Sequence, residues 1–434
     1  MADSRELPLS GVRVLSQAIV WAGPFGSMIL ADLGADVIEI ESIQHLNPTR
    51  ANMRHYPDGV LLGATGAALY NRDGSEGFWN RGATFNFAKR GHRSITIDLM
   101  RDEGRELFFG LVREADVFIE NNAADVVGDL GIDYPTLAAI NPRLIMVRFP
   151  GFGLDGPYAH FKGYGATMEA VVGHTILRGY RDSDPSLTPP IYHGDPNAGA
   201  HVAFSVQAAL IARERTGEGQ LIEISQAEAV LHHTSYALLD YVMNQRVQEH
   251  WGNRHPSMAP YGLFPARGEA RFVALAIDSD AAFASLCDVL GCPELASDAR
   301  FADAVTRYRE QDALEPLLAA RTRERDEREL MQQLQAAGVM AAIVAHQDEM
   351  TEDPHLRARE FFVTLEHPEV PARPYPGPMA RFRELPLVPL RGPAPLLGQH
   401  TAEVLHDLLG LDEARLAQLR ESQITGDAYL ESAR

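Results

Sequence analysis

The segment that decides the fold is GVRVLSQAIVWAGPFGSMILADLGADVIEIE, residues 11–41. Residues 12–15 form a short apolar run typical of a buried strand, and a turn then leads into a helix opened by a Gly-Pro pair. Gly34 is a natural C-terminal stop for that helix, and residues 35–41 give a second buried strand. Strand, helix and strand in this order form the repeating unit of a doubly wound parallel sheet.

The same alternation of strand and helix patterns continues to about residue 225. Further strand patterns cover residues 92–100, 116–121 and 144–153, with helical patterns between them. Residues 51–85 have weak periodicity and are expected to form a long loop or insertion. The sequence therefore predicts an α/β protein whose large domain is a doubly wound, Rossmann-like parallel sheet.

The pattern changes near residue 250, where a Pro/Gly-rich stretch precedes a set of Arg-rich helices. We expect residues 1–225 to form the first part of a discontinuous large domain and residues 226–250 a linker helix. Residues 251–330 would form a smaller inserted α+β domain, and residues 331–434 would return to the large domain and end in an extended tail.

Composition narrows the class of protein. The chain has 434 residues, which is more than one hydrophobic core usually serves, and a formal net charge of −20. That charge argues against nucleic-acid and anionic-membrane partners. The two cysteines, Cys287 and Cys292, do not resemble a disulfide framework or a zinc site. With a polar N-terminus and no apolar stretch of about 20 residues, we expect a soluble cytoplasmic protein.

Three common enzyme classes find little support. Glu41 ends the second strand where a dinucleotide enzyme would hold a ribose, but the first turn reads SQAIVWAGPFG and not GxGxxG. No GxSxG elbow indicates a serine hydrolase. His232 and His233 are adjacent, yet no HExxH motif accompanies them, so no metal site is predicted.

The turn GDPNAG, residues 194–199, places one carboxylate between a glycine and a proline. Local sequence alone favours helix capping, because Asp is a preferred N-cap and Pro suits the first helical position. The order of motifs along the chain suggests a second role for Asp195.

The chain resembles the class III CoA-transferases, also called the CaiB/BaiF family, over nearly its whole length. The segments that carry the resemblance follow the family's order: LSGVRVLSQAIVWAGPFGSMILADLGADVIEIE, KRGHRSITIDL, EADVFIEN, INPRLIMVRFPGFGLDGPY, GDPNAGAH, RTGEGQLIEISQAEAV, NRHPSMAPYGLFP and LLGQHTAEVL. Several blocks in sequence make this a specific match.

The resemblance implies that Asp195 is the nucleophile. A carboxylate with an ordinary pKa near 3.9 is ionised at neutral pH and attacks a thioester without a general base. The products would be a mixed anhydride and then an aspartyl-CoA thioester. Gly194 would leave room for the thioester, and the helix N-terminus after Pro196 would stabilise the oxyanion. No tightly bound cofactor is expected, since the CoA thioester is the substrate.

The resemblance also implies a set of residues that contact CoA or the acyl group: Val20, Trp21, Arg93, Ile97, Met100, Glu120, Asn121, Lys162 and Tyr164. Two arginines that many members use for the CoA phosphates are replaced here by Ser42 and Asp129. Arg50, Arg93 or Arg101 would have to supply the missing positive charge.

Alternatives within the family stay open. The related racemases carry a histidine where this chain has Tyr164, which disfavours racemase chemistry, although His160 is close. A second alternative is a CoA-binding subunit without catalytic activity in a heteromeric transferase. The glycine-rich loop of formyl-CoA transferases has no counterpart in residues 246–265, which argues against oxalate or formate as substrate.

Residues 51–85, 120–123 and 173–186 most resemble members that act on bulky or aromatic acids, such as benzylsuccinate-type transferases, with succinyl-CoA as donor. The family implies an interlocked, ring-like homodimer, and a related second subunit is the alternative partner.

Overall fold

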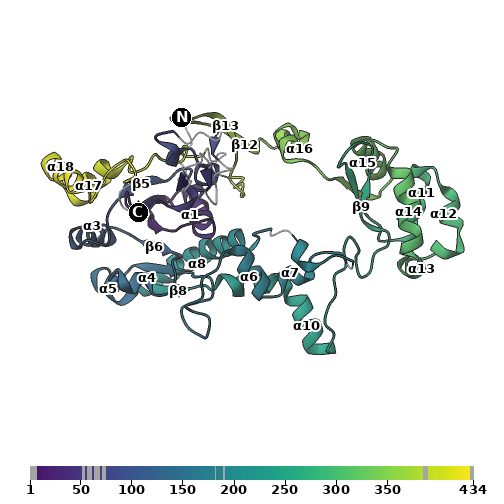
Figure 1. Ribbon diagram of the computed structural model, residues 1–434, viewed down its shortest axis with the longest axis horizontal. Coiled ribbons are helices and arrows are strands. Elements are labelled where there is room, and N and C mark those ends of the chain that lie inside the picture. Colours follow the sequence, from purple (N-terminus) through teal and green to yellow (C-terminus); the bar gives the residue numbers. More distant parts are fainter. Residues whose placement is uncertain are drawn as a thin grey trace. The chain divides into compact units, whose positions relative to one another are not determined.

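The computed structural model of the chain describes residues 7–50, 54–55, 61–62, 69–70, 75–180, 182–188, 191–384 and 390–430 (Figure 1). The chain divides into two compact units. The large unit comprises Met1–His174, Pro190–Tyr236 and Arg357–Arg434, and the small unit comprises Thr175–Pro189 and Ala237–Leu356. Much of the expected insertion at 51–85 falls outside the described residues.

The strand–helix–strand expectation for the opening segment is confirmed. β1 spans Arg13–Gln17, α1 spans Ala22–Asp32 and β2 spans Asp36–Glu41. Gly34 has a φ of +108°, a left-handed conformation that glycine adopts without steric cost and that ends the helix. β1 and β2 pair in parallel, so the chain re-enters the sheet in the same direction after the helix.

The large unit contains a six-stranded sheet in the order β5-β2-β1-β6-β7-β8. The other four strands are β5 (Arg93–Thr96), β6 (Val117–Glu120), β7 (Ile145–Arg148) and β8 (Gln220–Glu223), and every pairing is parallel. All four residues of β6 are buried, as expected for a strand covered on both faces. The predicted α/β class with a parallel sheet is confirmed.

Helices cover both faces of this sheet. α1 and α8 (Gly194–Thr216) pack on one face, around a core that includes Val14, Val117 and Val202. On the other face α3 (Asp102–Arg113) and α5 (Tyr134–Ile140) join two helices from the far end of the chain, α17 (Thr401–Leu409) and α18 (Glu413–Glu421). The C-terminal helices therefore belong to the core of the large unit (Figure 1).

The small unit has a three-stranded antiparallel sheet in the order β11-β10-β9. Its strands are β9 (Tyr261–Pro265), β10 (Phe272–Ala276) and β11 (Met340–Ile343), and its core helices are α11 (Asp280–Leu290), α14 (Gln311–Thr322) and α15 (Glu327–Ala336). Residues from 331 were expected to return to the large domain. They stay in the small unit as far as Leu356, because β11 pairs with β10.

The remaining elements are shorter. The helices and turns are η1 Pro48–Arg50, η4 Phe78–Asn80, α2 Ala83–Ala88, α4 Val126–Asp129, α6 Gly165–Val171, α7 His174–Leu177, η5 Pro185–Leu187, α9 Gln226–Leu231, η6 His232–Thr234, α10 Ser235–Asn244, α12 Pro293–Ser297, η7 Ala299–Phe301, α13 Ala304–Arg309, η8 Gln347–Glu352 and α16 Pro354–Ala358. The strands are β3 Arg54–His55, β4 Leu61–Leu62, β12 Phe362–His367 and β13 Val370–Pro376. Within the described ranges, no helix is both long enough and apolar enough to span a bilayer.

Candidate active site

Asp195 lies in the first turn of α8 and is only 6% exposed. The helix begins at Gly194, and His193 occupies the N-cap position without a side-chain capping hydrogen bond. The expectation that Asp195 is the N-cap is therefore wrong, because the helix starts earlier than the proline suggests. The buried carboxylate interacts with backbone N–H groups of both α1 and its own helix, those of Ala22 and Asp195.

The N-terminus of α1 meets the N-terminal part of α8 at two glycines. A Cβ on Gly199 would lie 2.6 Å from the carbonyl oxygen of Ala22, and a Cβ on Gly26 would lie 2.9 Å from the carbonyl oxygen of Gly199. Because both positions lack a side chain, the helices approach closely. The backbone N–H of Ala22 donates a hydrogen bond to the Asp195 carboxylate. Two helix N-termini, each with a partial positive charge, thus converge on one carboxylate.

The pKa of Asp195 is raised to about 6 from its ordinary value of 3.8. Burial is the main cause, and the hydrogen bond from Ala22 partly opposes it. The nearby charge of Glu169, a fully buried residue of α6, raises the pKa further. The expectation of an ordinary carboxylate pKa is therefore wrong. The group is still largely ionised at neutral pH, yet it is poorly solvated, which favours nucleophilic attack.

Gly165 is a site residue that the sequence analysis did not single out. A Cβ added to Gly165 would overlap Oδ2 of Asp195. Gly165 begins α6, and Tyr164, the N-cap residue, is 67% exposed. Tyr164, a predicted site residue, is therefore the chain neighbour of the residue that packs against Asp195. The signal for Gly165 was present in the GYG stretch, but only the contact with Asp195 shows why a glycine is needed there.

Both turns that lead to the site contain a strained residue. Val20 has a φ of +62° and Tyr192 a φ of +52°, a left-handed conformation that is rare for residues other than glycine. Val20 stands two residues before α1, and Tyr192 two residues before α8. Strain of this kind persists only where surrounding contacts enforce it, and it gathers at functional sites.

A cavity of about 410 Å³ opens at the carboxyl ends of β1, β2 and β5. Ligands of open α/β sheets bind at this edge. Ile97 and Met100, both predicted CoA contacts, line the cavity together with Ser42. Ile19 also lines it, and the chain reaches Ala22 three residues later. The β1–α1 turn, residues 18–21, thus runs along the chain from the cavity lining to Ala22, the residue that contacts Asp195.

Comparison with known proteins identifies the family. The family model described as CoA-transferase family III matches residues 9–401. The chain belongs to this family. It is 34% identical to the succinyl-CoA–D-citramalate CoA-transferase of Chloroflexus aurantiacus, over 96% of this chain and 98% of that protein. It is 33% identical to the succinate–glutarate CoA-transferase of Agrobacterium fabrum, over 93% and 96% of the two chains.

A solved structure agrees with this assignment. The crystal structure of a CAIB/BAIF family protein from Brucella suis matches 93% of this chain and all of that chain, with a TM-score of 0.80 and 31% sequence identity. The protein is thus a CoA-transferase with the CaiB/BaiF fold.

Glu120 and Asn121 of the CoA-transferase make contacts within the protein. Glu120 is fully buried, and its carboxylate accepts hydrogen bonds from Arg148 (2.7 Å) and from the backbone of Asn122 (2.8 Å). Asn121 binds the backbone of Ile19 through both ends of its amide. Asn121 thus supports the β1–α1 turn, whereas Glu120 holds Arg148 and the loop that follows β6.

The three arginines proposed for the CoA phosphates differ in their burial and in their position relative to the cavity. Arg50 is fully buried and pairs with Glu41 through both ends of the guanidinium. Arg93 begins β5 and pairs with Asp36 at the amino ends of the strands, the sheet edge opposite the cavity. Of the three, Arg101 is exposed and directly follows Met100, which lines the cavity.

Gly194 is needed for a different reason from the one expected. A Cβ there would lie 2.7 Å from Cγ2 of Val230 on α9, so helix packing excludes a side chain. Val20 and Trp21 lie in the turn before α1, as described above, with Trp21 at the N-cap. Lys162 is exposed and lies three residues before Gly165.

His160, the residue that kept racemase chemistry open, is paired with a carboxylate at the surface. Its Nδ1 lies 2.9 Å from a carboxylate oxygen of Asp125, and both side chains are more than 60% exposed. A racemase needs an acid and a base placed about the α carbon of the substrate. The pairing of His160 with Asp125 therefore gives no support to racemase chemistry.

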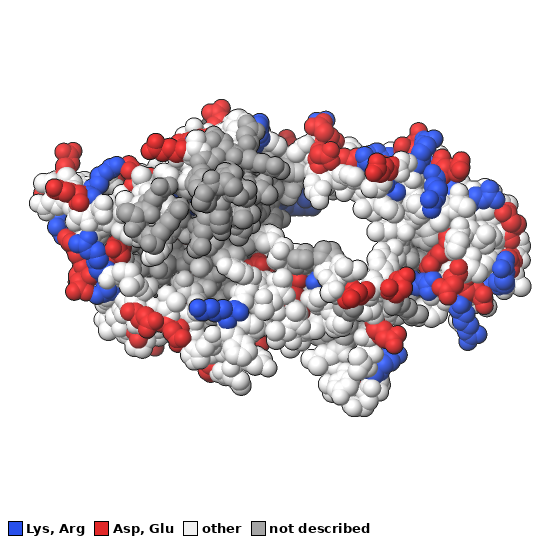
Figure 2. Space-filling view, in the orientation of Figure 1, with Lys and Arg blue, Asp and Glu red and all other residues white. Residues whose placement is uncertain are grey.

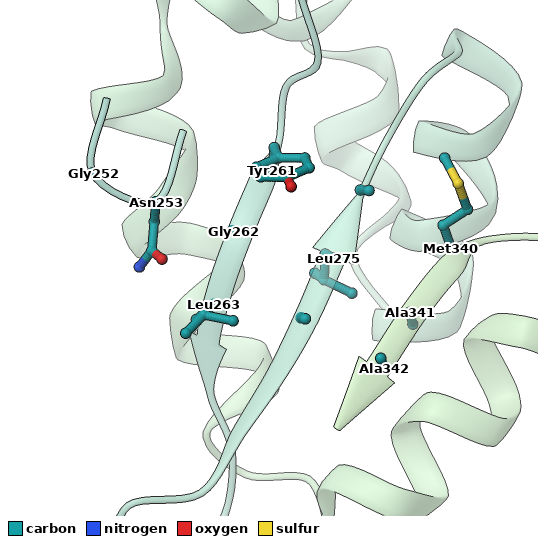
Figure 3. Close-up of a pocket in the computed structure, with 11 residues that line it drawn as sticks. Gly252, Asn253, Tyr261, Gly262, Leu263, Leu275, Met340, Ala341 and Ala342 are labelled. Atoms are coloured by element: carbon teal, nitrogen blue, oxygen red, sulfur yellow. The ribbon is translucent and has the colours of Figure 1, made fainter. Parts of the chain in front are cut away.

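A second cavity, of about 490 Å³, lies on the open face of the small unit's sheet (Figure 3). Tyr261, Leu263 and Met340 border a shallow floor of alanines. Its lining contains no carboxylate, thiol, lysine or histidine, so it offers no nucleophile for a thioester. On the face of this unit that Figure 2 shows, basic and acidic side chains are interspersed.

Proposed function

We propose that this CoA-transferase moves CoA from succinyl-CoA to a free carboxylic acid, with Asp195 as the covalent nucleophile. One observation carries the proposal. The Asp195 carboxylate is buried where the N-termini of α1 and α8 meet, and the β1–α1 turn connects it to the cavity at the sheet edge. This arrangement supports a CoA thioester whose nucleotide part lies in the cavity and whose carbonyl faces Asp195.

The reaction balances without a general acid or base. A carboxylate oxygen of Asp195 attacks the thioester carbonyl, the C–S bond breaks, and the CoA thiolate leaves with the electron pair. The thiolate then attacks the Asp195 carbonyl of the mixed anhydride, which frees the donor acid as a carboxylate. The acceptor carboxylate repeats these steps in reverse and leaves as its CoA thioester. Every attacking and leaving group is an anion, so no proton has to move.

The backbone at Asp195 is suited to the charge that develops in these steps. Each tetrahedral intermediate places a negative charge on a former carbonyl oxygen. The N–H of Ala22 and the N–H of Asp195 itself, in the first turn of α8, already donate to the carboxylate. Donors fixed by helix termini stabilise such an oxyanion without reorganisation, and loss of one donor costs roughly 10²–10³ in rate.

The cavity favours the nucleotide part of CoA. Apolar side chains such as Ile97, Leu99 and Leu130 line it and suit an adenine ring. Three acidic residues, Glu39, Glu41 and Asp98, also line it, so the phosphates must find positive charge near its mouth. We assign this role to Arg101.

The named relatives support one class of acceptor. D-citramalate and glutarate are aliphatic dicarboxylic acids, and both of those relatives are named for a succinate or succinyl-CoA partner. We therefore favour an aliphatic dicarboxylic acid as acceptor over the bulky or aromatic acids suggested by the sequence.

The assembly is proposed to be a homodimer of the interlocked kind. Support comes from exposed apolar residues on the outer face of α8, where Phe204 is 72% and Ile211 59% exposed. Large apolar side chains that gather on an exposed helix face favour a protein–protein interface. Light scattering on the purified chain tests this, because a monomer would contradict the homodimer and favour a related second subunit.

Isotope exchange tests the proposed reaction without knowledge of the acceptor. Labelled succinate and unlabelled succinyl-CoA are mixed with the enzyme, and label in succinyl-CoA is measured. Wild type should catalyse the exchange, and Asp195→Ala should lose at least about 10³-fold in rate, because the covalent route is gone. If Asp195→Ala catalysed the exchange at the wild-type rate, the proposal that Asp195 is the nucleophile would be wrong.

A further inference from the structure

Side chains from three other elements hold the backbone of the β1–α1 turn. Asn121, which follows β6, does so through its whole amide group. Its Oδ1 accepts a hydrogen bond from the backbone N–H of Ile19 at 2.7 Å, and its Nδ2 donates to the carbonyl oxygen of Ile19 at 3.0 Å. One residue earlier, the carbonyl oxygen of Ala18 accepts from Lys89 Nζ at 3.2 Å and from Asn47 Nδ2 at 3.3 Å.

These donors are themselves fixed. Lys89 and Asn47 are buried, and Lys89 forms an ion pair of 2.6 Å with Glu39 of β2. Buried, paired groups of this kind have little freedom to move, so they fix the turn in one position. Two consecutive peptide units, at residues 18 and 19, are therefore held from outside the turn.

The next residue is strained. Val20 is β-branched, and its φ of +62° is unfavourable for such a residue, so the surroundings must offset the strain. Two residues further on, the N–H of Ala22 donates to the Asp195 carboxylate. The contacts with Asn121 and Lys89 thus fix one end of a strained segment, and the hydrogen-bond donor for Asp195 lies at the other end.

We propose that Asn121 and Lys89 are positioning residues of the transferase, which force the β1–α1 turn into the left-handed conformation that aims the Ala22 N–H at Asp195. The proposal rests on the assigned role of Asp195. Neither side chain touches the reacting atoms. Both act through the backbone of residues 18–22, and Val20 carries the strain between them.

A purely structural role for Asn121 makes a different prediction. If its amide only stabilises the fold, its loss lowers the free energy of unfolding and leaves the chemistry of folded molecules unchanged. If it aims the Ala22 N–H, its loss weakens the hydrogen bond that lowers the Asp195 pKa. The Asp195 pKa would then rise, since burial and the Glu169 charge still raise it.

The test is the pH dependence of succinate–succinyl-CoA exchange by Asn121→Ala. We expect kcat/KM to fall about 10- to 100-fold and the acid limb of the profile to move to higher pH. Asn141→Ala is the matched control. The side-chain amide of Asn141 also makes two hydrogen bonds with the backbone, here by donating to the carbonyl oxygens of Val112 and Ala115, which lie outside the β1–α1 turn. This control should keep the wild-type acid limb.

Relief of the strain provides a second, independent readout. Glycine adopts a φ near +60° without cost, so Val20→Gly should keep the turn in place with fewer contacts. In the Asn121→Ala background, Val20→Gly is expected to recover at least about five-fold of the lost exchange rate. Asn121→Leu, which keeps the side-chain volume, replaces Asn121→Ala if that variant does not fold.

The outcomes separate the two proposals. An active wild type with an unchanged acid limb and rate in Asn121→Ala, or no recovery with Val20→Gly, would overturn the positioning role alone. A wild type that exchanges none of succinate, glutarate or acetate with its own CoA thioester would overturn the proposed function and this inference with it.

Discussion

The helices that meet at Asp195 begin differently from three helices of the small unit, α11, α13 and α15, although α12 and α14 of that unit also lack a side-chain cap. In the small unit, α11, α13 and α15 each have an N-cap side chain that accepts a hydrogen bond from a backbone N–H of the first turn. These N-cap residues are Ser279, Asp303 and Asp326. At the site, α1 and α8 start at Trp21 and His193 with no side-chain cap. Their first N–H groups are therefore free for the nucleophile and for the oxyanion.

This contrast indicates that the helix starts at Asp195 are less stable locally and leave their N–H groups available to the reaction. A side-chain cap contributes about 1 kcal/mol, and the small unit uses it repeatedly. Around Asp195 the chain instead contains uncapped helix starts, two strained residues and a poorly solvated carboxylate. Substitutions on the two sides of this comparison should have opposite effects on stability and activity.

The largest expected effect comes from filling the space beside the nucleophile. Gly165→Ala places a methyl group where Oδ2 of Asp195 now lies, so the carboxylate must move. We expect a loss of at least about 100-fold in the succinate exchange rate with little loss of folded protein. Gly128→Ala is the control, since a Cβ at Gly128 meets no atom within 4 Å. Wild-type exchange by Gly165→Ala would contradict the site geometry.

Removal of the Asp195 charge should stabilise the protein. The folded-state pKa of about 6 lies above the ordinary 3.8, so the ionisation cost is full above about pH 6 and absent below about pH 4. Asp195→Asn should therefore raise the free energy of unfolding by about 1–3 kcal/mol near pH 7.5 and leave it unchanged near pH 4. Urea unfolding at the two pH values measures the difference.

The control for this prediction lies in the small unit. The pKa of Asp298 is lowered by hydrogen bonds from the Arg300 side chain and backbone. A lowered carboxylate pKa stabilises the fold above the ordinary value, so Asp298→Asn should lose stability near pH 7.5. The same sign of change at both positions would break the comparison between the two regions.

Removal of a cap in the small unit should affect stability alone. Oγ of Ser279 accepts the N–H of Ala282 at the start of α11. Ser279→Ala is expected to lower the free energy of unfolding by about 1 kcal/mol, as measured by urea titration, with an unchanged exchange rate. A reduced exchange rate in folded Ser279→Ala would show that the small unit's helix starts also serve the chemistry.

The smallest expected effect is a shift of the pH profile. Glu169 raises the pKa of Asp195 by its charge, and its Oε1 accepts the backbone N–H of His193 at 2.6 Å. Glu169→Gln removes the charge and keeps an oxygen acceptor. The acid limb of exchange should move to lower pH by about half a unit, opposite to Asn121→Ala. Movement to higher pH would contradict the assigned electrostatics.

The sequence predicted the parts of the molecule that depend on local pattern. The β1–α1–β2 unit follows from apolar runs separated by glycines, and Asp195 from a motif in its family context. The roles of Gly165 and Glu169 were missed, because each depends on a contact with a residue more than 20 positions away. The spacing of residues in the sequence also does not show that Arg50 forms a buried ion pair with Glu41.

The boundary of the small unit shows the same limit. Residues 340–343 have the apolar pattern of a strand, and that pattern fits either domain. Only their antiparallel pairing with β10, about 65 residues earlier in the chain, assigns them to the small sheet.

Trapping of the covalent intermediate tests the central claim most directly. Enzyme incubated with succinyl-CoA is treated with hydroxylamine, which attacks an activated aspartyl carbonyl, and the peptides are mapped by mass spectrometry. The account predicts a hydroxamate on the peptide that contains Asp195 in wild type and none in Asp195→Ala. An active enzyme that leaves Asp195 unmodified, or a hydroxamate on another carboxylate such as Glu169, would contradict it.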